Sequence, residues 1–287
     1  MSEELPRGGP TVRRMLVGAQ LRRLRTEAGI TREQAGEAIR ASAWKVHRLE
    51  NGQVGYKERD VIDLLRLYGV TDHGEIDTFV ALAHEANQPG WWNAYSDLLP
   101  LWFRAYIDLE SVATLIRTYE GQLVPGLLQT EAYMRAVVRG ALHEPPEDTE
   151  RRIALRLTRQ RLLTRPDGPR LWAVVDEAAL RRPVGGREVM RAQVARLLEA
   201  TELPGVILQV LPLAVGAHPG MASAFAILRF PDVGLPDVVY LERLDDATYV
   251  DRRESVDHYY HVMELISARS AAPEKTPELL DKILSEW

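Results

Sequence analysis

The sequence predicts two domains, a small all-α N-terminal domain followed by a larger α+β domain with a mainly antiparallel sheet. Its 287 residues exceed the usual length of one domain. Apolar residues recur at helical spacing up to Ala86, whereas strand-like apolar runs occur only after the turn sequence Asn87-Gln88-Pro89-Gly90. We therefore expect a disordered arm at residues 1–10, the all-α domain at 11–88 and the α+β domain at 89–287.

The composition is typical of an ordinary soluble globular protein. Hydrophobic residues make up 46% of the chain and charged residues 27%, which is enough for a sizeable core. The absence of cysteine excludes disulfides and thiolate metal sites. No apolar run reaches the length of a transmembrane helix, and the N-terminus lacks the apolar segment of a signal peptide. We therefore expect a cytoplasmic protein with no membrane partner.

Positive charge is concentrated in the first domain. The whole chain carries a formal net charge of −5. Between Thr11 and Lys57, however, ten Lys and Arg side chains accompany four Glu, an excess of six positive charges that leaves an excess of eleven negative charges elsewhere. A basic module on an acidic body predicts a polyanionic partner for the module alone.

Five helices are expected in the first domain. The first runs from Val12 to Ala28 and ends at Gly29. Thr31 caps the second, and its spacing to Gln34 matches a capping box, in which each side chain bonds the backbone of the other residue. The remaining helices are expected at about 42–50, 58–68 and 76–86.

The second and third helices are predicted to form a helix-turn-helix. They cover about residues 31–39 and 42–50, so only a very short turn around Arg40-Ala41 separates them. Such a connection allows the third helix to lie in the major groove of double-stranded DNA. Val46 and Leu49 form its inner face. The fold class expected for the first domain is therefore an all-α helix-turn-helix bundle.

The outer face of the third helix carries side chains that can contact bases. Arg48 can donate two hydrogen bonds to guanine, and Lys45 can contact guanine or hold a phosphate. Trp44 can pack on a thymine methyl group, and His47 can donate or accept a hydrogen bond. Arg32 lies at the start of the second helix, where helix N-termini meet phosphate. The alternatives are a solvated helix face and, for Trp44, a contact with another subunit.

Strands and helices are mixed in the second domain without regular alternation, which favours an α+β fold. Strands are expected at about residues 113–119, 171–175, 205–211, 222–230 and 238–241. Helices are expected after a cap near Thr130 and at about residues 146–163, 177–180, 187–202, 253–267 and 277–287.

Polar residues of the second domain are candidates for a ligand or partner site: Glu110, Gln129, Thr130, Asp176, Glu177, Gln193, His218 and Glu242. Residues of these types more often cap a helix or turn. His258 and His261 can share a helical face, but no third ligand is evident, so no metal is expected. The sequence has no nucleophile-elbow, zinc-protease, P-loop or dinucleotide-binding motif, and we expect neither a cofactor nor an enzyme.

The first domain resembles the Cro/CI (XRE) helix-turn-helix family over about residues 12–70. The resemblance rests on GAQLRRLRTEAGITREQAG at 18–36 and SAWKVHRLENG at 42–52. It implies a structural ion pair between Arg25 and Glu50, for which a weak surface pair is the alternative. Gly36 departs from the family pattern, where alanine is more usual, and glycine in a helix costs up to about 1 kcal/mol. The resemblance implies base contacts by Ala43, Trp44, Lys45, His47 and Arg48, and phosphate contacts by Arg32, Ser42, Asn51 and Lys57.

The rest of the chain contains the motifs WWxxY, PGLLQTEAY, DEAAL, GGREVMxxQ and VLP. Together they resemble those of actinobacterial regulators of the antitoxin-like Scr type. Such regulators carry a helix-turn-helix ahead of a large domain of uncertain function and are often encoded beside a small partner protein. The similarity implies a transcription regulator.

Three functional hypotheses remain open. The first is a sequence-specific DNA-binding regulator that is a homodimer, because one small recognition helix contacts few bases. Its second domain would provide dimerisation and bind a small-molecule effector or a protein. In the second hypothesis the second domain is an enzyme or a degenerate enzyme. The third is an antitoxin that neutralises a small protein encoded nearby, which the acidic body and the Trp-rich segment 91–103 permit.

Overall fold

A computed structural model describes residues 10–88, 90–141, 145–230 and 236–287. The chain divides into two compact units, the first formed chiefly by residues up to Ala94 and the second chiefly by residues from Ala113 onward. Helix α6 (Leu101–Val112) is divided between them. Residues 1–9 of the expected N-terminal arm lie outside the described residues, and Pro10 begins helix α1. The domain limits expected from the sequence stay a prediction.

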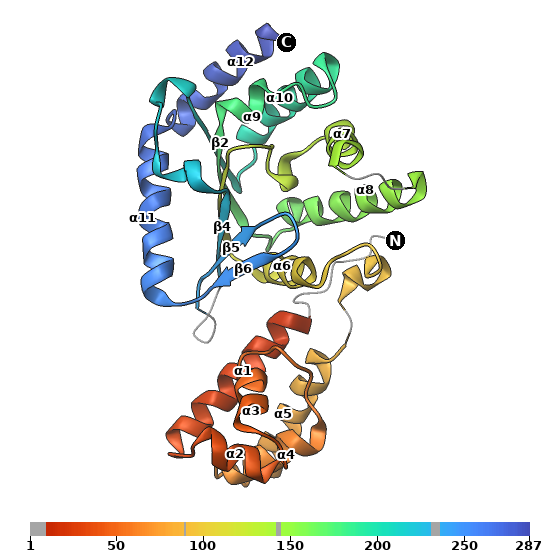
Figure 1. The fold of residues 1–287 in the computed structure, drawn as a ribbon, viewed down its shortest axis with the longest axis vertical. Coiled ribbons are helices and arrows are strands. Elements are labelled where there is room, and N and C mark those ends of the chain that lie inside the picture. The colour runs from red at the N-terminus through yellow and green to blue at the C-terminus, as the bar shows by residue number, and fades with distance from the viewer. Residues whose placement is uncertain (1–9, 89, 142–144, 231–235) are drawn as a thin grey trace. The chain divides into compact units, whose positions relative to one another are not determined.

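The first unit is helical, as predicted (Figure 1). The predicted capping box is confirmed, since Thr31 Oγ1 accepts a hydrogen bond from Gln34 N at 3.3 Å and Gln34 Oε1 accepts one from Thr31 N at 2.9 Å. The helices are α1 (Pro10–Glu27), α2 (Arg32–Ala38), α3 (Ala43–Glu50), α4 (Glu58–Leu67) and α5 (His73–Ala86).

The core of the first unit fixes which face of α3 remains available. Val46 and Leu49 of α3 are each 1% exposed and pack with Leu21 of α1 and Leu64 of α4. Burial of each such side chain contributes about 1.5–3 kcal/mol. Leu16 of α1 lies away from this core and is 39% exposed. The inward direction predicted for Val46 and Leu49 is correct, and Trp44 and Arg48 are the exposed residues of α3.

The second unit contains a six-stranded mixed sheet in the order β3-β2-β1-β4-β5-β6. The first three strands are parallel, and the pairings β1–β4, β4–β5 and β5–β6 are antiparallel. The predicted α+β fold with a mainly antiparallel sheet is therefore confirmed. The strands are β1 (Leu115–Glu120), β2 (Arg170–Asp176), β3 (Val206–Leu211), β4 (Phe225–Arg229), β5 (Val238–Glu242) and β6 (Ala247–Val250).

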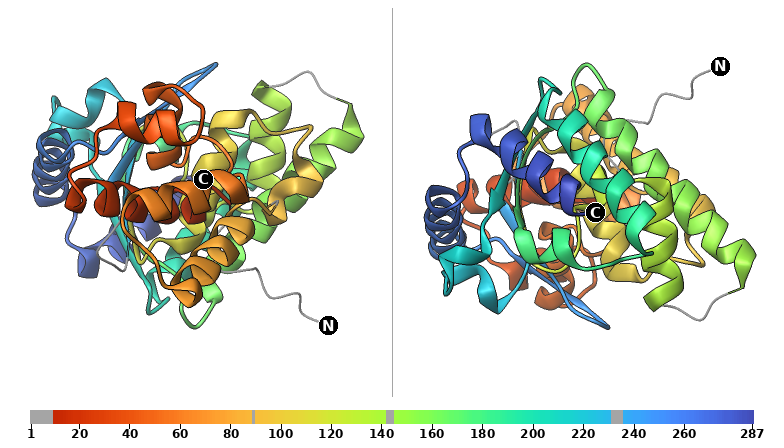
Figure 2. Two further views of the ribbon diagram at one scale, coloured as in Figure 1. Left: turned by 90° about the horizontal axis from the view of Figure 1, so that it is seen from below. Right: turned by 90° about the horizontal axis from the view of Figure 1, so that it is seen from above.

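Helices cover both faces of this sheet. Figure 1 and both views of Figure 2 show α11 on one side and α7, α8 and α10 on the other. The helices of this unit are α7 (Glu131–Ala141), α8 (Pro146–Gln160), α9 (Glu177–Arg181), α10 (Arg187–Thr201), α11 (Arg253–Arg269) and α12 (Thr276–Glu286). Short 3-10 helices occur at Trp91–Tyr95, Gly126–Leu128, Arg161–Thr164, Leu213–Val215, Pro219–Ala222 and Pro273–Lys275.

The face under α11 is apolar along most of its length. Tyr119, Val174 and Phe225 of the sheet are buried there against Met263 and Ile266 of α11. Because β1, β2 and β3 are parallel, their carboxyl ends meet at one edge of the sheet. No helix in the described part of the chain is both long and apolar enough to span a bilayer.

Candidate nucleic-acid interface

The turn between α2 and α3 depends on a close backbone approach. A Cβ atom on Gly36 would lie 2.7 Å from the carbonyl oxygen of Ala41, so only glycine fits without displacing the turn. Within the turn, Arg40 has φ 55°, a left-handed conformation that side chains disfavour. The departure of Gly36 from the family pattern therefore has a steric cause, the tight packing of α2 on the turn that orients α3.

A buried carboxylate fastens the end of α3. Glu50, whose side chain is 1% exposed, accepts from Arg25 Nε at 2.5 Å and from Arg32 Nε at 2.9 Å. Arg25 also donates to the carbonyl oxygen of Ile30 at 2.7 Å. The hydrogen bond that Arg25 donates to Glu50 raises the pKa of Arg25 above its ordinary value, against the opposing effect of burial. Arg32, expected to contact phosphate, is thus engaged with Glu50 while its side chain stays 35% exposed.

Lys45, a predicted base contact, lies in an ion pair with α4. Its Nζ is 2.6 Å from Asp60 Oδ2. Ser42, a predicted phosphate contact, is exposed and caps α3 by accepting from Lys45 N at 3.3 Å. The sequence analysis did not identify Asp60 as a partner of Lys45. An acidic residue in the first turn of a helix is common because it interacts favourably with the helix dipole, so Asp60 did not stand out.

An aromatic pair lies on the outer face of α3. The rings of Trp44 and His47 are stacked at 5.1 Å between centroids with an angle of 25°, and the Trp44 residue is 65% exposed. Asn51 Nδ2 lies 3.0 Å from His47 Nε2. The predicted phosphate contact Asn51 therefore supports His47, and the stacked rings of Trp44 and His47 present a flat aromatic surface.

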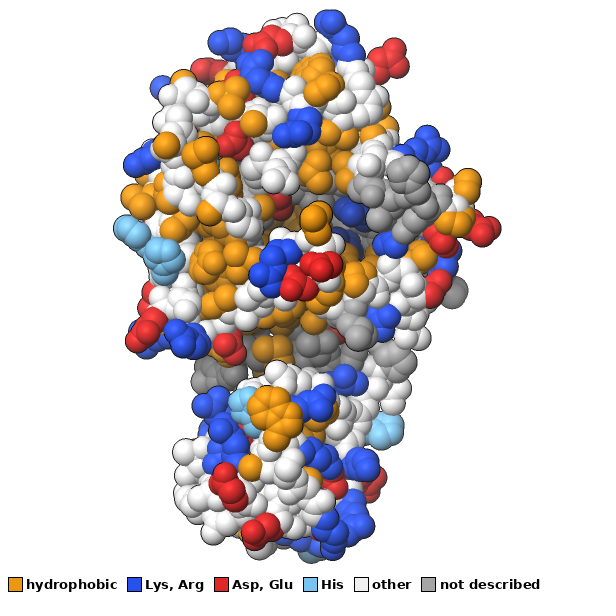
Figure 3. All heavy atoms as spheres, in the orientation of Figure 1, with side chains coloured by type: hydrophobic (Ala, Val, Ile, Leu, Met, Phe, Trp, Pro, Cys, Tyr) orange, Lys and Arg blue, Asp and Glu red, His pale blue; other side chains and the backbone are white. Residues whose placement is uncertain are grey.

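Arg48 and Lys57 are the most available cations of the predicted interface. Both are exposed, and neither side chain forms a hydrogen bond or ion pair within the described residues. Ala43, small and half-buried, precedes Trp44 at the start of α3. On the face of the first unit seen in Figure 3, Lys and Arg side chains predominate over Asp and Glu.

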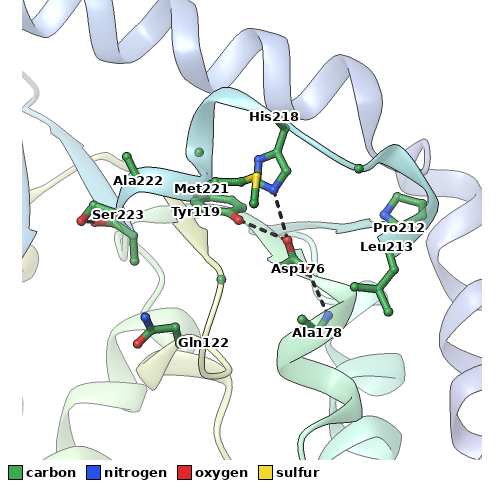
Figure 4. A pocket seen from close by; sticks show the side chains of 14 residues that line it. Tyr119, Gln122, Asp176, Ala178, Pro212, Leu213, His218, Met221, Ala222 and Ser223 are labelled. Carbon is green, nitrogen blue, oxygen red and sulfur yellow. Dashed lines mark hydrogen bonds and ion pairs between the residues drawn. The ribbon is translucent and has the colours of Figure 1, made fainter.

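In the second unit, the structure brings two of the polar candidates together. Asp176 lies at the end of β2. Its Oδ2 accepts a hydrogen bond from the Tyr119 hydroxyl at 3.2 Å and lies 3.4 Å from His218 Nε2 (Figure 4). Its Oδ1 accepts from Ala178 N at 2.9 Å and caps α9. Burial, and then the Asp176 carboxylate, raise the pKa of Tyr119 well above its usual value, so the phenol stays protonated as a donor.

This cluster borders a cavity of about 290 Å³. Its lining includes Tyr119, Asp176, Leu213, His218, Met221 and Ser223. Sequence reasoning named Asp176 and His218 but missed Tyr119, Leu213 and Met221, because a pocket residue of an apolar strand or loop has no distinguishing pattern. The useful signal was the position of Tyr119 and Asp176 near the carboxyl ends of two strands.

Comparison with known proteins places most of the chain in a family. A family described as "Domain of unknown function (DUF5753)" matches residues 103–282. The chain belongs to the DUF5753 family. A helix-turn-helix domain family matches residues 16–79, which indicates a DNA-binding regulator. No curated protein and no solved structure matches the chain.

Other polar candidates of the DUF5753 domain make contacts inside the fold. Gln193 on α10 accepts from Thr130 N at 2.7 Å and donates to Leu128 O at 2.9 Å, which fixes the segment before α7. Gln129 donates to Val124 O at 2.7 Å within the same segment. Gln129 and Gln193 therefore stabilise the turn before α7 through these hydrogen bonds.

The acidic candidates of the chain are also engaged. Glu177 accepts from Arg181 Nε at 2.7 Å and from Leu213 N at 2.8 Å. Glu242 accepts from the Tyr240 hydroxyl at 3.0 Å. Glu110 is fully buried on α6. Within the described residues, no group of three or more His, Asp or Glu is arranged to hold a metal ion.

Proposed function

We propose that this chain is a sequence-specific DNA-binding transcription regulator of the Cro/CI (XRE) type, with α3 as its recognition helix. The outer face of α3 carries the proposal. Val46, Leu49 and Glu50 are buried, while Arg48 and Trp44 are exposed. A helix that presents an exposed guanidinium beside a flat aromatic surface suits hydrogen bonding to guanine and packing on thymine methyl groups.

The other polar residues of the first unit have different roles in this proposal. Lys57 and Ser42 are exposed and contact phosphate directly. Lys45 reaches DNA by exchanging Asp60 for a base or phosphate, since its side chain is 36% exposed in that ion pair. Arg25 is left as a structural residue, and Arg32 both supports Glu50 and meets phosphate through its exposed part.

We propose that the regulator acts in the cytoplasm as a homodimer on two half-sites. One α3 contacts few base pairs, and two-fold pairing supplies the specificity that a genome requires. The DUF5753 domain would provide dimerisation and a sensor or partner surface. We propose a binding role for it rather than a catalytic one, because Gln193, Glu177 and Thr130 are engaged in holding loops and turns.

DNA selected from a random pool by the full chain tests this function. Arg48→Ala should weaken binding to the selected site by about 5- to 150-fold, since a bidentate guanine contact contributes about 1–3 kcal/mol. Arg23→Ala is the matched control, because Arg23 is an exposed arginine of α1 paired with Glu27. Titration in a gel-shift assay measures both. Equal binding by Arg48→Ala and the wild type would refute the assignment of α3.

The antitoxin-like role of the Scr type is the second candidate, and the acidic balance of the chain outside its N-terminal module favours it. Co-expression with the product of the adjacent gene, followed by size-exclusion chromatography, decides it. A stable complex supports this role, and elution of two separate species removes it. DNA binding is measured independently, so both roles can hold together.

A further inference from the structure

We propose that the pocket bordered by Tyr119, Asp176 and His218 binds a small organic amine in its cationic form. The ligand class follows from where the pocket lies, from the charge of its lining and from the apolar side chains at its rim. As an effector site the pocket rests on the regulator function proposed above. Amine binding to the pocket is measured without DNA, so a failure of this proposal can be distinguished from a failure of the proposed DNA-binding function.

The pocket lies where sheets with parallel strands bind ligands. Tyr119 is near the carboxyl end of β1, Asp176 ends β2, and Pro212 follows β3. The segment from Gly216 to Ala224 completes the wall (Figure 4). Loops at the carboxyl edge of parallel strands form a crevice in which polar groups from several strands converge.

A close contact keeps that wall against the sheet. A Cβ atom on Gly220 would lie 2.9 Å from Tyr119 Cε1 and 2.6 Å from Ile266 Cδ1. Glycine therefore lets the loop approach both the tyrosine ring and α11. The side of the pocket formed by Tyr119 is therefore closely packed, and the Tyr119 hydroxyl donates a hydrogen bond to Asp176.

The charge of the lining favours a cation. Asp176 is the carboxylate among the described residues that line the cavity, and no Lys or Arg is among them. His218 Nδ1 is buried and has no hydrogen-bond partner within the described residues, while His218 Nε2 lies 3.4 Å from Asp176 Oδ2. No Lys or Arg in the described lining opposes the Asp176 carboxylate, and this disfavours anions.

The rim of the pocket suits the apolar part of such a ligand. Leu213 and Met221 line the cavity and are 54% and 68% exposed. Large apolar side chains at the mouth of a polar cavity gain by being covered. A volume of about 290 Å³ limits the ligand to a small amine.

Calorimetric titration of the full chain tests the inference with a panel of small amines. The panel is butylamine, putrescine and 2-phenylethylamine, and 1-butanol, butyrate, 2-phenylethanol and phenylacetate share the skeletons without the positive charge. At least one amine should bind about tenfold more tightly than the alcohol of its skeleton, because a charge-assisted hydrogen bond is added. Binding of alcohol and amine with equal affinity throughout the panel, or tighter binding of a carboxylate, overturns the proposal.

Two substitutions locate the binding in this pocket. Asp176→Asn retains an oxygen that can cap α9 but removes the charge, so it should abolish the preference for amine over alcohol. Asp281→Asn, at an exposed position of α12, should retain the preference. If both variants prefer the amine equally, the site is elsewhere.

Met221→Lys provides a test that does not disturb the buried cluster. Its exposed side chain would place a cation at the rim and should lower amine affinity by about threefold at low salt, with a smaller effect at high salt. If Asp176→Asn does not fold, the amine affinity of Met221→Lys tests whether the amine binds in this pocket. Unchanged amine affinity in Met221→Lys would overturn the proposal.

Discussion

Glu50 is a single residue that holds α3 in place without contributing to its outward face. It lies in the same helix as Arg48 and is conspicuous in the sequence as a charge, yet its side chain is 1% exposed. Two guanidinium groups, from Arg25 and Arg32, compensate it. The buried carboxylate fixes the end of α3, and the outward face is thereby left to other side chains.

Glu50→Gln should destabilise the first unit by about 2–4 kcal/mol. The substitution keeps the shape of the side chain but leaves Arg25, whose side chain is 12% exposed, without its counter-charge. Thermal unfolding followed by circular dichroism measures the change. Glu37→Gln, on the exposed side of α2, is the control and should alter stability by less than about 0.5 kcal/mol. Equal stability of the two variants would show that the pair is a weak surface contact.

Glu120 should make the stability of the second unit depend on pH. Burial, and then repulsion from Glu242, raise its pKa from 4.5 to about 8, although Thr118 donates to it at 3.4 Å. Between these values the unfolded chain has lost the proton that the folded chain keeps, so stability falls as pH rises through the window. The free energy of unfolding, measured with urea, should drop by about 3–4 kcal/mol between about pH 5 and about pH 8.

Glu120→Gln should flatten that dependence, because the amide does not titrate. Glu274→Gln, at an exposed position before α12, should retain the slope of the wild type. A slope that survives in Glu120→Gln would assign the pH dependence to another group.

At the scale of elements, the turn between α2 and α3 gives the sharpest contrast between sequence and structure. Helix propensity predicts that Gly36→Ala stabilises the chain by up to about 1 kcal/mol. The structure predicts the opposite, a loss of about 1–3 kcal/mol, because the new Cβ would lie 2.7 Å from Ala41 O. Gly140→Ala on α7 is the matched control, since nothing lies within 4 Å of its Cβ position and the gain should appear there. Chemical denaturation of both variants measures the sign.

The elements that the sequence predicted correctly are those with a strong local pattern. The inner face of α3 and the capping box at Thr31 follow from spacing that the tertiary fold does not alter. Helix α6 was missed because Leu101–Val112 continues an aromatic segment without clear periodicity. Strand β6, Ala247–Val250, is short and only half-buried, so it lacks an alternating signal.

The sequence did not predict which strands and side chains from distant parts of the chain lie next to each other in the molecule. From β1 to β3 the chain alternates strands with helices and the strands are parallel, whereas β4 to β6 are antiparallel. This division brings Tyr119, Asp176 and His218 together from distant parts of the second unit. Asp60 reaches Lys45 in a similar way in the first unit. Both contacts depend on how the elements pack, which no local pattern encodes.

The uneven charge of the molecule leads to a prediction about how many subunits contact DNA. Each phosphate contact lowers the logarithm of the binding constant by about 0.9 per tenfold increase in salt. Lys57→Ala removes one such contact in a monomer and two in a homodimer, so its salt slope should be shallower by about 1.8 for the dimer proposed above. Binding to the selected DNA site over a salt series gives the slope, and sedimentation of the complex gives its stoichiometry. Lys275→Ala, at an exposed position of the second unit, should leave the slope unchanged. A change of about 0.9 with a single subunit on DNA would contradict the dimer, and no change would remove Lys57 from the phosphate contacts.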